Sequence, residues 1–402
     1  MKTIAVIGGG ASGMMAALTA ARDPRNRVIL LERQQRVGRK LLATGNGRCN
    51  LTNINALPDA YLGQDASFAA PALNAFTPQD TLRFFSSLGL LTVTEESGRV
   101  YPLSDSANSV LDVLRFALEQ AGVLIRCSSP VDSLMRTENG FRIVSSEETL
   151  AADKVILACG GAAGSKLGGV MDGYKLLKAL GHRRTPLYPS LTRIVTATDY
   201  PRSLKGVRVQ ASLRLTRGDL LLAKTEGEVQ FTEKGVSGPA GFDISRAAAV
   251  GGDGLTLHLQ LLPFNKEDIL ALLQDRTGQF PFLEASDLFT GMLPNRLGRV
   301  VVKAAGIPAS TQLSSLSPDL LFAAAETCAD FRLPVLGVEG FEAAQVTAGG
   351  IVTRDFDPDT LESRLVPGLF VCGEVLDIDG PCGGYNLQWA WASGALAGRL
   401  GT

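Results

Sequence analysis

An apolar run at the start of the chain leads without a spacer into a cluster of glycines, and this junction constrains the fold strongly. Residues 2–7 form the apolar run, and Gly8-Gly9-Gly10-Ala11-Ser12-Gly13 follows it. Residues 14–21 then favour a helix, and residues 28–31 are again apolar. This order predicts a strand, a tight turn, a helix and a second strand, as in the parallel sheet of an α/β protein.

The glycine spacing gives this turn a specific use. Gly8, Gly10 and Gly13 fit the pattern G-x-G-x-x-G. In such turns the first glycine allows the tight turn, the second lets the backbone approach a pyrophosphate, and the third lets the helix pack closely on the strand. Glu32 ends the second strand, where a carboxylate can accept hydrogen bonds from ribose hydroxyls. The spacing predicts a dinucleotide site and leaves NAD and FAD open.

The composition is that of a folded globular protein with two or more domains. The chain has 402 residues, of which 45% are hydrophobic and 20% charged. Its net charge of −1 gives no global case for binding nucleic acid or an anionic membrane. The six cysteines form no C-x-x-C pair, so we expect reduced thiols, a cytoplasmic location and no metal. Because no apolar run reaches about eighteen residues and glycines interrupt the first one, we expect neither a membrane span nor an export signal.

The stretch after Glu32, residues 33–53, is the least ordinary part of the sequence. It is dense in glycine and asparagine, and its basic residues include Arg36, Arg39, Lys40 and Arg48. Such a loop offers backbone N–H groups and fixed cations to an anion such as a pyrophosphate. The alternative is a solvated basic loop with turn glycines. Cys49 invites a redox interpretation, but a small packed thiol is favoured because no cysteine is near it in sequence.

The next segments return the chain to the sheet. Amphipathic helices are predicted at 71–90 and 107–121, and strands at 123–127 and 154–159. Between these strands, Asn139-Gly140 predicts the turn of a β-hairpin. The last strand runs into Gly160-Gly161, a glycine turn that lacks G-x-G-x-x-G spacing.

These features together resemble the FAD domain of two-dinucleotide-binding flavoproteins. One family among them, the BaiN/RdsA family of FAD-dependent NAD(P)H oxidoreductases (aminoacetone-oxidase-like flavoproteins), is indicated by a hallmark loop that this chain matches at Gly38-Arg39-Lys40 and at Gly45-Asn46-Gly47-Arg48-Cys49-Asn50-Leu51-Thr52-Asn53. The resemblance implies an α/β fold in which a Rossmann-like FAD-binding domain is interrupted by an insert. The FAD-binding domain would comprise residues 1–190 and 338–402. The insert would be a β-rich module at 191–260 and a helical bundle at 261–337.

The sequence of this middle region agrees with such an insert. Alternation at 207–215 predicts a half-exposed strand, and further strands are expected at 219–224 and 228–232. A turn at 235–240 would introduce a helix at 240–249, and four more helices are predicted at 265–274, 283–291, 296–305 and 317–328. The region carries no second G-x-G-x-x-G, so NAD(P)H would bind only transiently. Residues 182–217 are basic, with eight Lys or Arg against one acid, Asp199.

The C-terminal segment resembles the second FAD motif of this superfamily. Residues 368–377 predict a buried strand that runs into an acidic loop, and 380–388 open a helix that ends near Gly398. A helix N-terminus would stabilise the negative charge of a reduced flavin. Trp389 and Trp391 lie within this helix, and their side chains are predicted to pack in the protein rather than to stack on the flavin. The resemblance implies cofactor contacts for Gly8, Gly10, Ala11, Ser12, Gly13, Glu32, Arg33, Arg39, Lys40, Gly45, Asn46, Gly47, Arg48, Cys49, Asn50, Val131, Ala158, Gly160, Gly373, Glu374, Asp377, Gly384, Tyr385, Asn386 and Leu387.

The protein groups suited to acid–base chemistry are few. His258 alternates with leucines in an apolar strand, and His182 follows a helix, so neither indicates a catalytic triad or a metal site. The difficult chemical step would therefore belong to the flavin. The candidates for a proton donor beside it are Tyr385, Cys49, Cys382 and Glu374.

Four functions stay open at this point. The first is an ene reductase that passes hydride from NAD(P)H through FAD to the C=C bond of an enone related to steroids or bile acids. The second is reduction of a uridine in 23S ribosomal RNA, for which the basic segment could contact phosphates. The third is a flavin amine oxidase that releases hydrogen peroxide. A non-catalytic flavin-binding module is the fourth, and the paired FAD motifs disfavour it.

Overall fold

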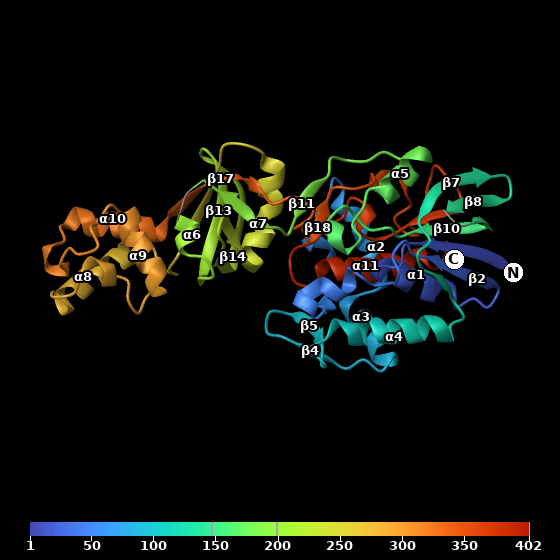
Figure 1. Ribbon diagram of the computed structural model, residues 1–402, viewed down its shortest axis with the longest axis horizontal. Helices are drawn as coiled ribbons and strands as arrows, with labels where there is room; N and C mark the ends of the chain where they lie inside the picture. The colour runs from blue at the N-terminus through green and yellow to red at the C-terminus, as the bar shows by residue number, and fades with distance from the viewer. Residues whose placement is uncertain (146–147, 198–199, 402) are drawn as a thin grey trace. The chain divides into compact units, whose positions relative to one another are not determined.

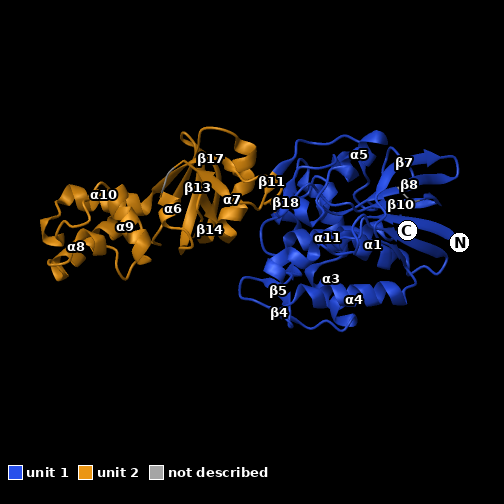
Figure 2. Cartoon of the chain, viewed as in Figure 1, with its two compact units in different colours: residues 1–188, 345–402 blue, residues 189–344 orange. Residues whose placement is uncertain are grey.

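The computed structural model describes residues 1–145, 148–197 and 200–401, which form two compact units (Figure 2). Unit 1 comprises Met1–Tyr188 and Gln345–Thr402, and unit 2 comprises Pro189–Ala344. Unit 1 is therefore discontinuous in sequence. Its assignment as the FAD-binding domain and the division of the insert at residue 260 stay predictions.

A five-stranded parallel sheet forms the centre of unit 1 (Figure 1). The strand order is β19 (Leu369–Val371), β10 (Lys154–Leu157), β1 (Lys2–Ile7), β2 (Asn26–Leu31) and β6 (Leu124–Arg126). The predicted strand–turn–helix–strand unit is confirmed. Because all five strands are parallel, their carboxyl ends share one edge, and the chain leaves β1 there through the glycine turn.

The first and last long helices of unit 1 pack closely together. A Cβ on Gly394 of α11 (Tyr385–Ala397) would lie 2.4 Å from the Ser12 carbonyl oxygen of α1 (Ala11–Ala20). A Cβ on Gly398 would lie 2.6 Å from the carbonyl oxygen of Ala16. Small residues thus let the two backbones approach, and the helices lie side by side in Figure 1. The predicted packing of the tryptophans is confirmed: both are buried, and their indole N–H groups donate to backbone carbonyls.

The remaining elements of unit 1 surround this sheet. Two small antiparallel sheets have the orders β3 (Thr52–Asn53), β5 (Arg99–Pro102), β4 (Thr92–Thr94) and β7 (Val131–Thr137), β8 (Gly140–Ser145), β9 (Thr149–Ala152). The predicted hairpin turn at Asn139-Gly140 joins β7 to β8. The other helices and strands of this part of the chain are α2 (Ala70–Ala75), α3 (Pro78–Ser87), α4 (Ala107–Gln120), α5 (Asp172–Ala179) and β18 (Val346–Ala348), and β11 (Tyr188–Ser190) starts at the last residue of the first segment of unit 1 and continues into unit 2.

The single helix predicted at 71–90 is wrong. The chain breaks after Ala75 and starts α3 anew, because Thr77 forms a capping box with Asp80 and Pro78 occupies the first helical turn. Proline lacks the N–H that a continuous helix would need at this position.

Unit 2 combines a closed barrel with a group of helices. The barrel order is β12 (Ile194–Thr196), β15 (Gly235–Ser237), β14 (Leu220–Phe231), β13 (Arg208–Arg217), β16 (Leu255–Gln260) and β17 (Phe331–Val338). The predicted alternation in β13 is confirmed, since its leucines are buried while Arg208 and Arg214 are exposed. The helices are α6 (Tyr200–Ser203), α7 (Gly238–Gly251), α8 (Lys266–Gln279), α9 (Asn295–Ala304) and α10 (Pro318–Ala329).

Three boundaries predicted in this region are wrong. The strands expected at 219–224 and 228–232 form the single strand β14, because β13 pairs with it continuously through Gly227. Residues 235–237 of the expected turn form β15. The helix expected at 283–291 is only a short 3-10 turn, since the N–H of Ala285 donates to the carbonyl oxygen of Thr311 and the N–H of Ser286 to that of Ala309.

Both histidines have structural partners. His258 lies between the hydroxyl of Thr216, 3.0 Å from Nε2, and the carboxylate of Asp330, 2.7 Å from Nδ1. His182 is buried, with Nε2 3.1 Å from the hydroxyl of Ser363 and its ring stacked on Phe356. Burial lowers the pKa of His182, although Asp355 opposes the shift. Folding therefore favours the neutral form of the His182 imidazole.

This burial predicts acid sensitivity. The unfolded chain protonates His182 below a pKa of about 6.5, whereas the folded chain does so only at lower pH. The free energy of unfolding should therefore fall by up to about 1.4 kcal/mol per pH unit as the pH drops below 6.5, and the loss should level off below the folded-state pKa. Urea titrations of the wild type and His182→Gln between pH 7.5 and 5 measure this. Parallel pH profiles for the two proteins would contradict the prediction.

Candidate functional site

The three motif glycines divide into two that pack and one that faces open space. Gly8 has φ +110°, and a Cβ there would lie 2.4 Å from the carbonyl oxygen of Ala158. A Cβ on Gly13 would lie 1.9 Å from the carbonyl oxygen of Gly8. At Gly10, the residue before the first turn of α1, a Cβ would meet none of the described atoms within 4 Å. This leaves space where the N–H groups of the helix start can meet an anion, and it fits the approach of a pyrophosphate.

Glu32 lies directly against the glycine turn. Its Oε2 accepts a hydrogen bond from the N–H of Gly9 at 2.7 Å, and its Oε1 accepts one from the N–H of Gln34, also at 2.7 Å. Each carboxylate oxygen can accept a further hydrogen bond. The carboxylate is thus held in place and can still accept hydrogen bonds from ribose hydroxyls. The guanidinium of Arg33 forms an ion pair with the carboxylate of Asp172, at 3.8 Å.

The basic loop adopts a rare backbone conformation at its glycines. Within the 3-10 segment Leu41–Gly47, Gly45 and Asn46 both have φ +57°, and Gly47 follows with φ +89°. This left-handed run suits glycine and asparagine, which explains the residue types in the stretch. It also exposes Asn46 and Gly47. The contact of this loop with FAD stays a prediction.

Two arginines of this loop, Arg39 and Arg48, have partners within the protein. Arg39 donates to the side-chain oxygen of Gln34 at 2.8 Å. Arg48 pairs with Asp105 and with Glu95, and its guanidinium lies 3.9 Å from the centre of the Tyr101 ring. The sequence did not indicate these acidic partners of Arg48. Its guanidinium anchors the loop to neighbouring segments.

Lys40 joins the basic loop to the second motif. Its ammonium lies 2.7 Å from Oε2 of Glu374, which belongs to the 3-10 turn Gly373–Val375 after β19. The other oxygen of Glu374 accepts the N–H of Thr347 at 2.8 Å. A Cβ on Gly161 would lie 2.7 Å from Glu374 and 2.4 Å from the Thr347 hydroxyl. Thr347 and Gly161, next to the predicted Gly160, were not among the predicted cofactor residues, although both lie beside Glu374.

The second motif packs on the first. A Cβ on Gly373 would lie 2.5 Å from the Ser12 hydroxyl, and the N–H of Gly373 donates to Ser393 at 3.0 Å. Gly373 therefore links the start of α1 to the later part of α11. Gly383 and Gly384 have φ values of +109° and +104°, which suit glycine at the turn into the helix.

Polar side chains hold the Gly383-Gly384 turn and the residues on either side of it. The amide of Asn386 exchanges hydrogen bonds with the backbone of Gly380, so it holds the loop before the helix. Asn53 donates to the carbonyl oxygen of Gly383 at 3.0 Å. Gln388 is fully buried and hydrogen-bonded. The sequence offered one signal for Gln388, which is its place as a polar residue in an apolar helical run.

The other predicted cofactor residues occupy several positions in unit 1. Ala158 directly follows β10 and lies beside Gly8, and Ala11 is the first residue of α1. Asp377 is buried and accepts a hydrogen bond from the N–H of Gln64 at 3.2 Å. Three others are half-buried: Asn50, Val131 and Leu387. Their contacts with FAD stay predictions.

The candidate proton donors have different surroundings. Burial raises the pKa of the Cys49 thiol to about 12, so this group is a packed thiol, as favoured from the sequence. Glu374 is held by Lys40 and Thr347. The ring of Tyr385 lies edge-on to that of Tyr61 at 6.3 Å, and Tyr61 donates to the carbonyl oxygen of Tyr385. Cys382 is half-buried in the loop before α11.

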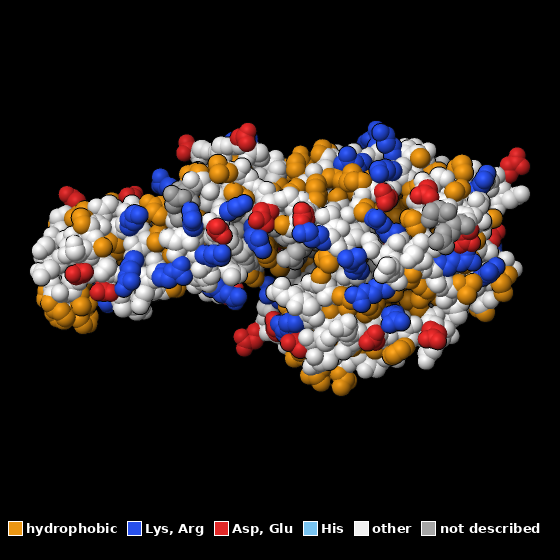
Figure 3. All heavy atoms as spheres, in the orientation of Figure 1, with side chains coloured by type: hydrophobic (Ala, Val, Ile, Leu, Met, Phe, Trp, Pro, Cys, Tyr) orange, Lys and Arg blue, Asp and Glu red, His pale blue; other side chains and the backbone are white. Residues whose placement is uncertain are grey.

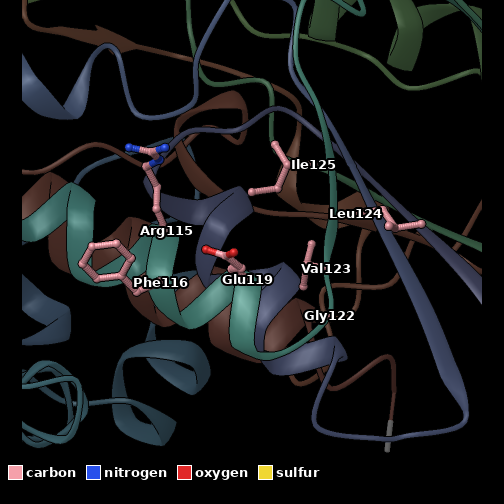
Figure 4. Close-up of a pocket in the computed structure, with 7 residues that line it drawn as sticks. All are labelled: Arg115, Phe116, Glu119, Gly122, Val123, Leu124 and Ile125. Carbon is pink, nitrogen blue, oxygen red and sulfur yellow. The ribbon is translucent and has the colours of Figure 1, made fainter.

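A separate hollow of about 390 Å³ lies beside the outer strand β6 (Figure 4). Its lining contains none of the predicted cofactor or catalytic residues and consists of Arg115, Phe116, Glu119, Gly122, Val123, Leu124 and Ile125. The hollow therefore adds nothing to the candidate site at the carboxyl edge of the sheet.

The basic segment at 182–217 is partly neutralised by acidic partners. Ion pairs join Arg193 to Glu339, Lys205 to Glu233, Arg208 to Glu228 and Arg214 to Asp330, whereas Asp199 lies outside the described residues. Figure 3 shows acidic side chains among the basic ones on the visible face. The described residues include no group of three or more His, Cys, Asp or Glu side chains that could hold a metal. No helix in the described ranges is long and apolar enough to cross a membrane.

The comparisons with known proteins agree with this geometry. The model of the HI0933-like protein Rossmann domain matches residues 2–400. The chain belongs to this family. It is 39% identical to the 3-dehydro-bile acid delta(4,6)-reductase of Clostridium scindens, over 99% of this chain and 98% of the relative. It is 32% identical to the ribosomal RNA dihydrouridine synthase of Escherichia coli, over 96% and 95%.

A solved structure, the 3-ketosteroid delta1-dehydrogenase of Sterolibacterium denitrificans, matches over 99% of both chains with 14% identity and a TM-score of 0.48. These two values are too low to carry an inference. The predicted family and the Rossmann-like α/β fold class are confirmed by the family match. At the level of class, the prediction of an FAD-dependent oxidoreductase is confirmed as well.

The glycine turn yields a prediction that separates cofactor approach from packing. Gly10→Ala should fold with unchanged stability, because the added methyl group meets open space, yet it should weaken FAD binding at least tenfold. Gly13→Ala should destabilise the fold by roughly 1–3 kcal/mol, because its methyl group would overlap the carbonyl of Gly8. Thermal unfolding and FAD titration by flavin fluorescence measure both. Equal loss of stability in the two variants would refute the division.

The raised pKa of Cys49 predicts that replacing this residue leaves the flavin spectrum and the turnover nearly unchanged. Because the thiol stays protonated at pH 7–9, Cys49→Ser should keep the flavin spectrum and turnover within about twofold of the wild type. Alkylation of the folded protein by iodoacetamide, located by mass spectrometry, should spare Cys49. Loss of turnover together with normal FAD content in Cys49→Ser would show that the thiol acts in the reaction.

Proposed function

We propose that this chain is an FAD-dependent ene reductase, which transfers hydride from NAD(P)H to the activated C=C bond of a steroid-like enone. The observation that carries the proposal is the identity of 39% to a bile-acid reductase along nearly the whole of both chains. The contacts that join the glycine turn and the basic loop to the second motif, Ser12 to Gly373, Lys40 to Glu374 and Asn53 to Gly383, support FAD as the cofactor.

The residues of this chain would divide the work of holding the cofactor. The open start of α1 at Gly10 suits the pyrophosphate, and the anchored carboxylate of Glu32 suits a ribose. Lys40 and Glu374 suit phosphate and hydroxyl groups between the two motifs. The N-terminus of α11 would stabilise negative charge on the flavin pyrimidine. When bound, FAD supplies the hydride chemistry.

The proton that completes a C=C reduction needs a separate source. The candidates that we propose for this role are Tyr385 at the start of α11, Glu374 beside Lys40 and Cys382 in the loop before α11. The burial and the raised pKa of Cys49 argue against this role for its thiol. NAD(P)H would reduce the flavin in a transient complex.

A direct test uses the purified protein loaded with FAD under anaerobic conditions. NADPH or NADH should bleach the flavin absorbance, and a steroid enone should then restore it and yield a product with two more hydrogens. The saturated ketone serves as a control and should leave the flavin reduced. A flavin that reoxidises at the same rate with and without the enone would refute the proposal.

Dihydrouridine synthesis on ribosomal RNA is the second candidate, and the identity of 32% to such a synthase supports it. The ion pairs in the basic segment weaken the case for a large phosphate-binding surface there. Mapping dihydrouridine in the ribosomal RNA of a deletion strain tests it, and an unchanged pattern would remove it. Peroxide release on adding aminoacetone would favour the amine oxidase instead.

A further inference from the structure

One buried glutamine connects three segments at the start of α11. Oε1 of Gln388 accepts hydrogen bonds from the hydroxyls of Thr52 and Thr81, each at 2.7 Å. Its Nε2 donates to the carbonyl oxygen of Phe76 at 2.8 Å. Gln388 and both threonines have no exposed surface. A buried amide of this kind persists only when partners satisfy it, so the contact fixes the relative positions of these segments.

The two threonines differ in what they adjoin. Thr52 belongs to β3, and a Cβ on Gly384 would lie 2.4 Å from its backbone C and O atoms. The next residue, Asn53, donates to the carbonyl oxygen of Gly383. Thr81 instead lies inside α3, which continues to Ser87. The bond from Thr52 therefore ties Gln388 to the strand on which the glycine pair rests, and the bond from Thr81 ties it to a supporting helix.

We propose that the Thr52–Gln388 hydrogen bond is a positioning contact for the flavin. It holds β3, the end of the basic loop, in fixed register with the first turns of α11. The N–H of Gln388 already bonds to the carbonyl oxygen of Gly384, so a shift of the side chain is passed to the turn. The inference rests on the proposed function, because it requires FAD with its pyrimidine at the start of this helix.

The partial positive charge at the N-terminus of α11 would link the Thr52–Gln388 contact to the reduction potential of bound FAD. Backbone N–H groups there stabilise negative charge, and reduction of a flavin increases the negative charge on its pyrimidine. Displacing the start of α11 therefore weakens binding of the reduced cofactor more than binding of the oxidised one. The contact would thus influence the reduction potential, although neither Thr52 nor Gln388 needs to touch the cofactor.

The two threonines supply a matched test. Thr52→Val and Thr81→Val each remove one hydroxyl donor to the same oxygen, keep the side-chain shape and leave the other donor in place. Both variants should show the same drop in Tm. Thr52→Val should weaken the binding of reduced FAD relative to oxidised FAD tenfold, which makes the midpoint potential of bound FAD about 30 mV more negative. Thr81→Val should leave that ratio within twofold, and Thr52→Ser should restore it.

Spectroelectrochemical titration of the FAD-loaded proteins gives the potentials, independently of any substrate. Equal shifts in both valine variants, or a shift in neither, would overturn the positioning role, as would a failure of Thr52→Ser to restore the potential. A wild type that binds no FAD would overturn this inference and the proposed function together. A selective shift in Thr52→Val without enone reduction by the wild type would remove the proposed substrate class and keep the positioning contact.

Discussion

The close crossing of α1 and α11 is the contact on which the candidate site depends. Gly394 and Gly398 let the backbone of α11 approach Ser12 and Ala16 of α1 more closely than any side chain would allow. The contact places Ser12, at the start of α1, against Gly394 in the later part of α11, so the position of one helix along its axis fixes that of the other. Gly373, packed against Ser12, extends this contact to β19. The two cofactor motifs, which lie at opposite ends of the sequence, are thereby one structural element.

Much of this arrangement could be predicted from the sequence, because the signals are local. The glycine spacing at residues 8–13, the apolar runs and the hairpin turn at Asn139-Gly140 act over a few residues, and each is found where predicted. The alternation in β13 likewise predicts its buried and exposed faces. The resemblance to a flavoprotein family then supplied the second motif, whose strand, acidic turn and helix are present.

The features that could not be predicted depend on partners distant in sequence. Arg48 pairs with Asp105 and Glu95, which lie about fifty residues away in the sequence. This pairing decides whether the guanidinium is available for a ligand, and a local pattern does not reveal it. Gln388 and Thr52 are 336 residues apart. The unbroken strand β14 follows from its pairing with β13 rather than from its own residues. In each case tertiary contact overrides a local pattern, so boundaries and side-chain roles are harder to predict than the elements themselves.

The discontinuity of unit 1 has a consequence in time. A ribosome makes the glycine turn and the basic loop first, and then all of unit 2, before it makes β19 and α11. Until those last residues emerge, the central sheet lacks an outer strand, and α1 lacks the helix that covers Ser12 and Ala16. At that stage a nascent chain has the first motif without the second. Completion of the site is tied to the end of synthesis, so a prematurely terminated chain would lack the part proposed to control the flavin.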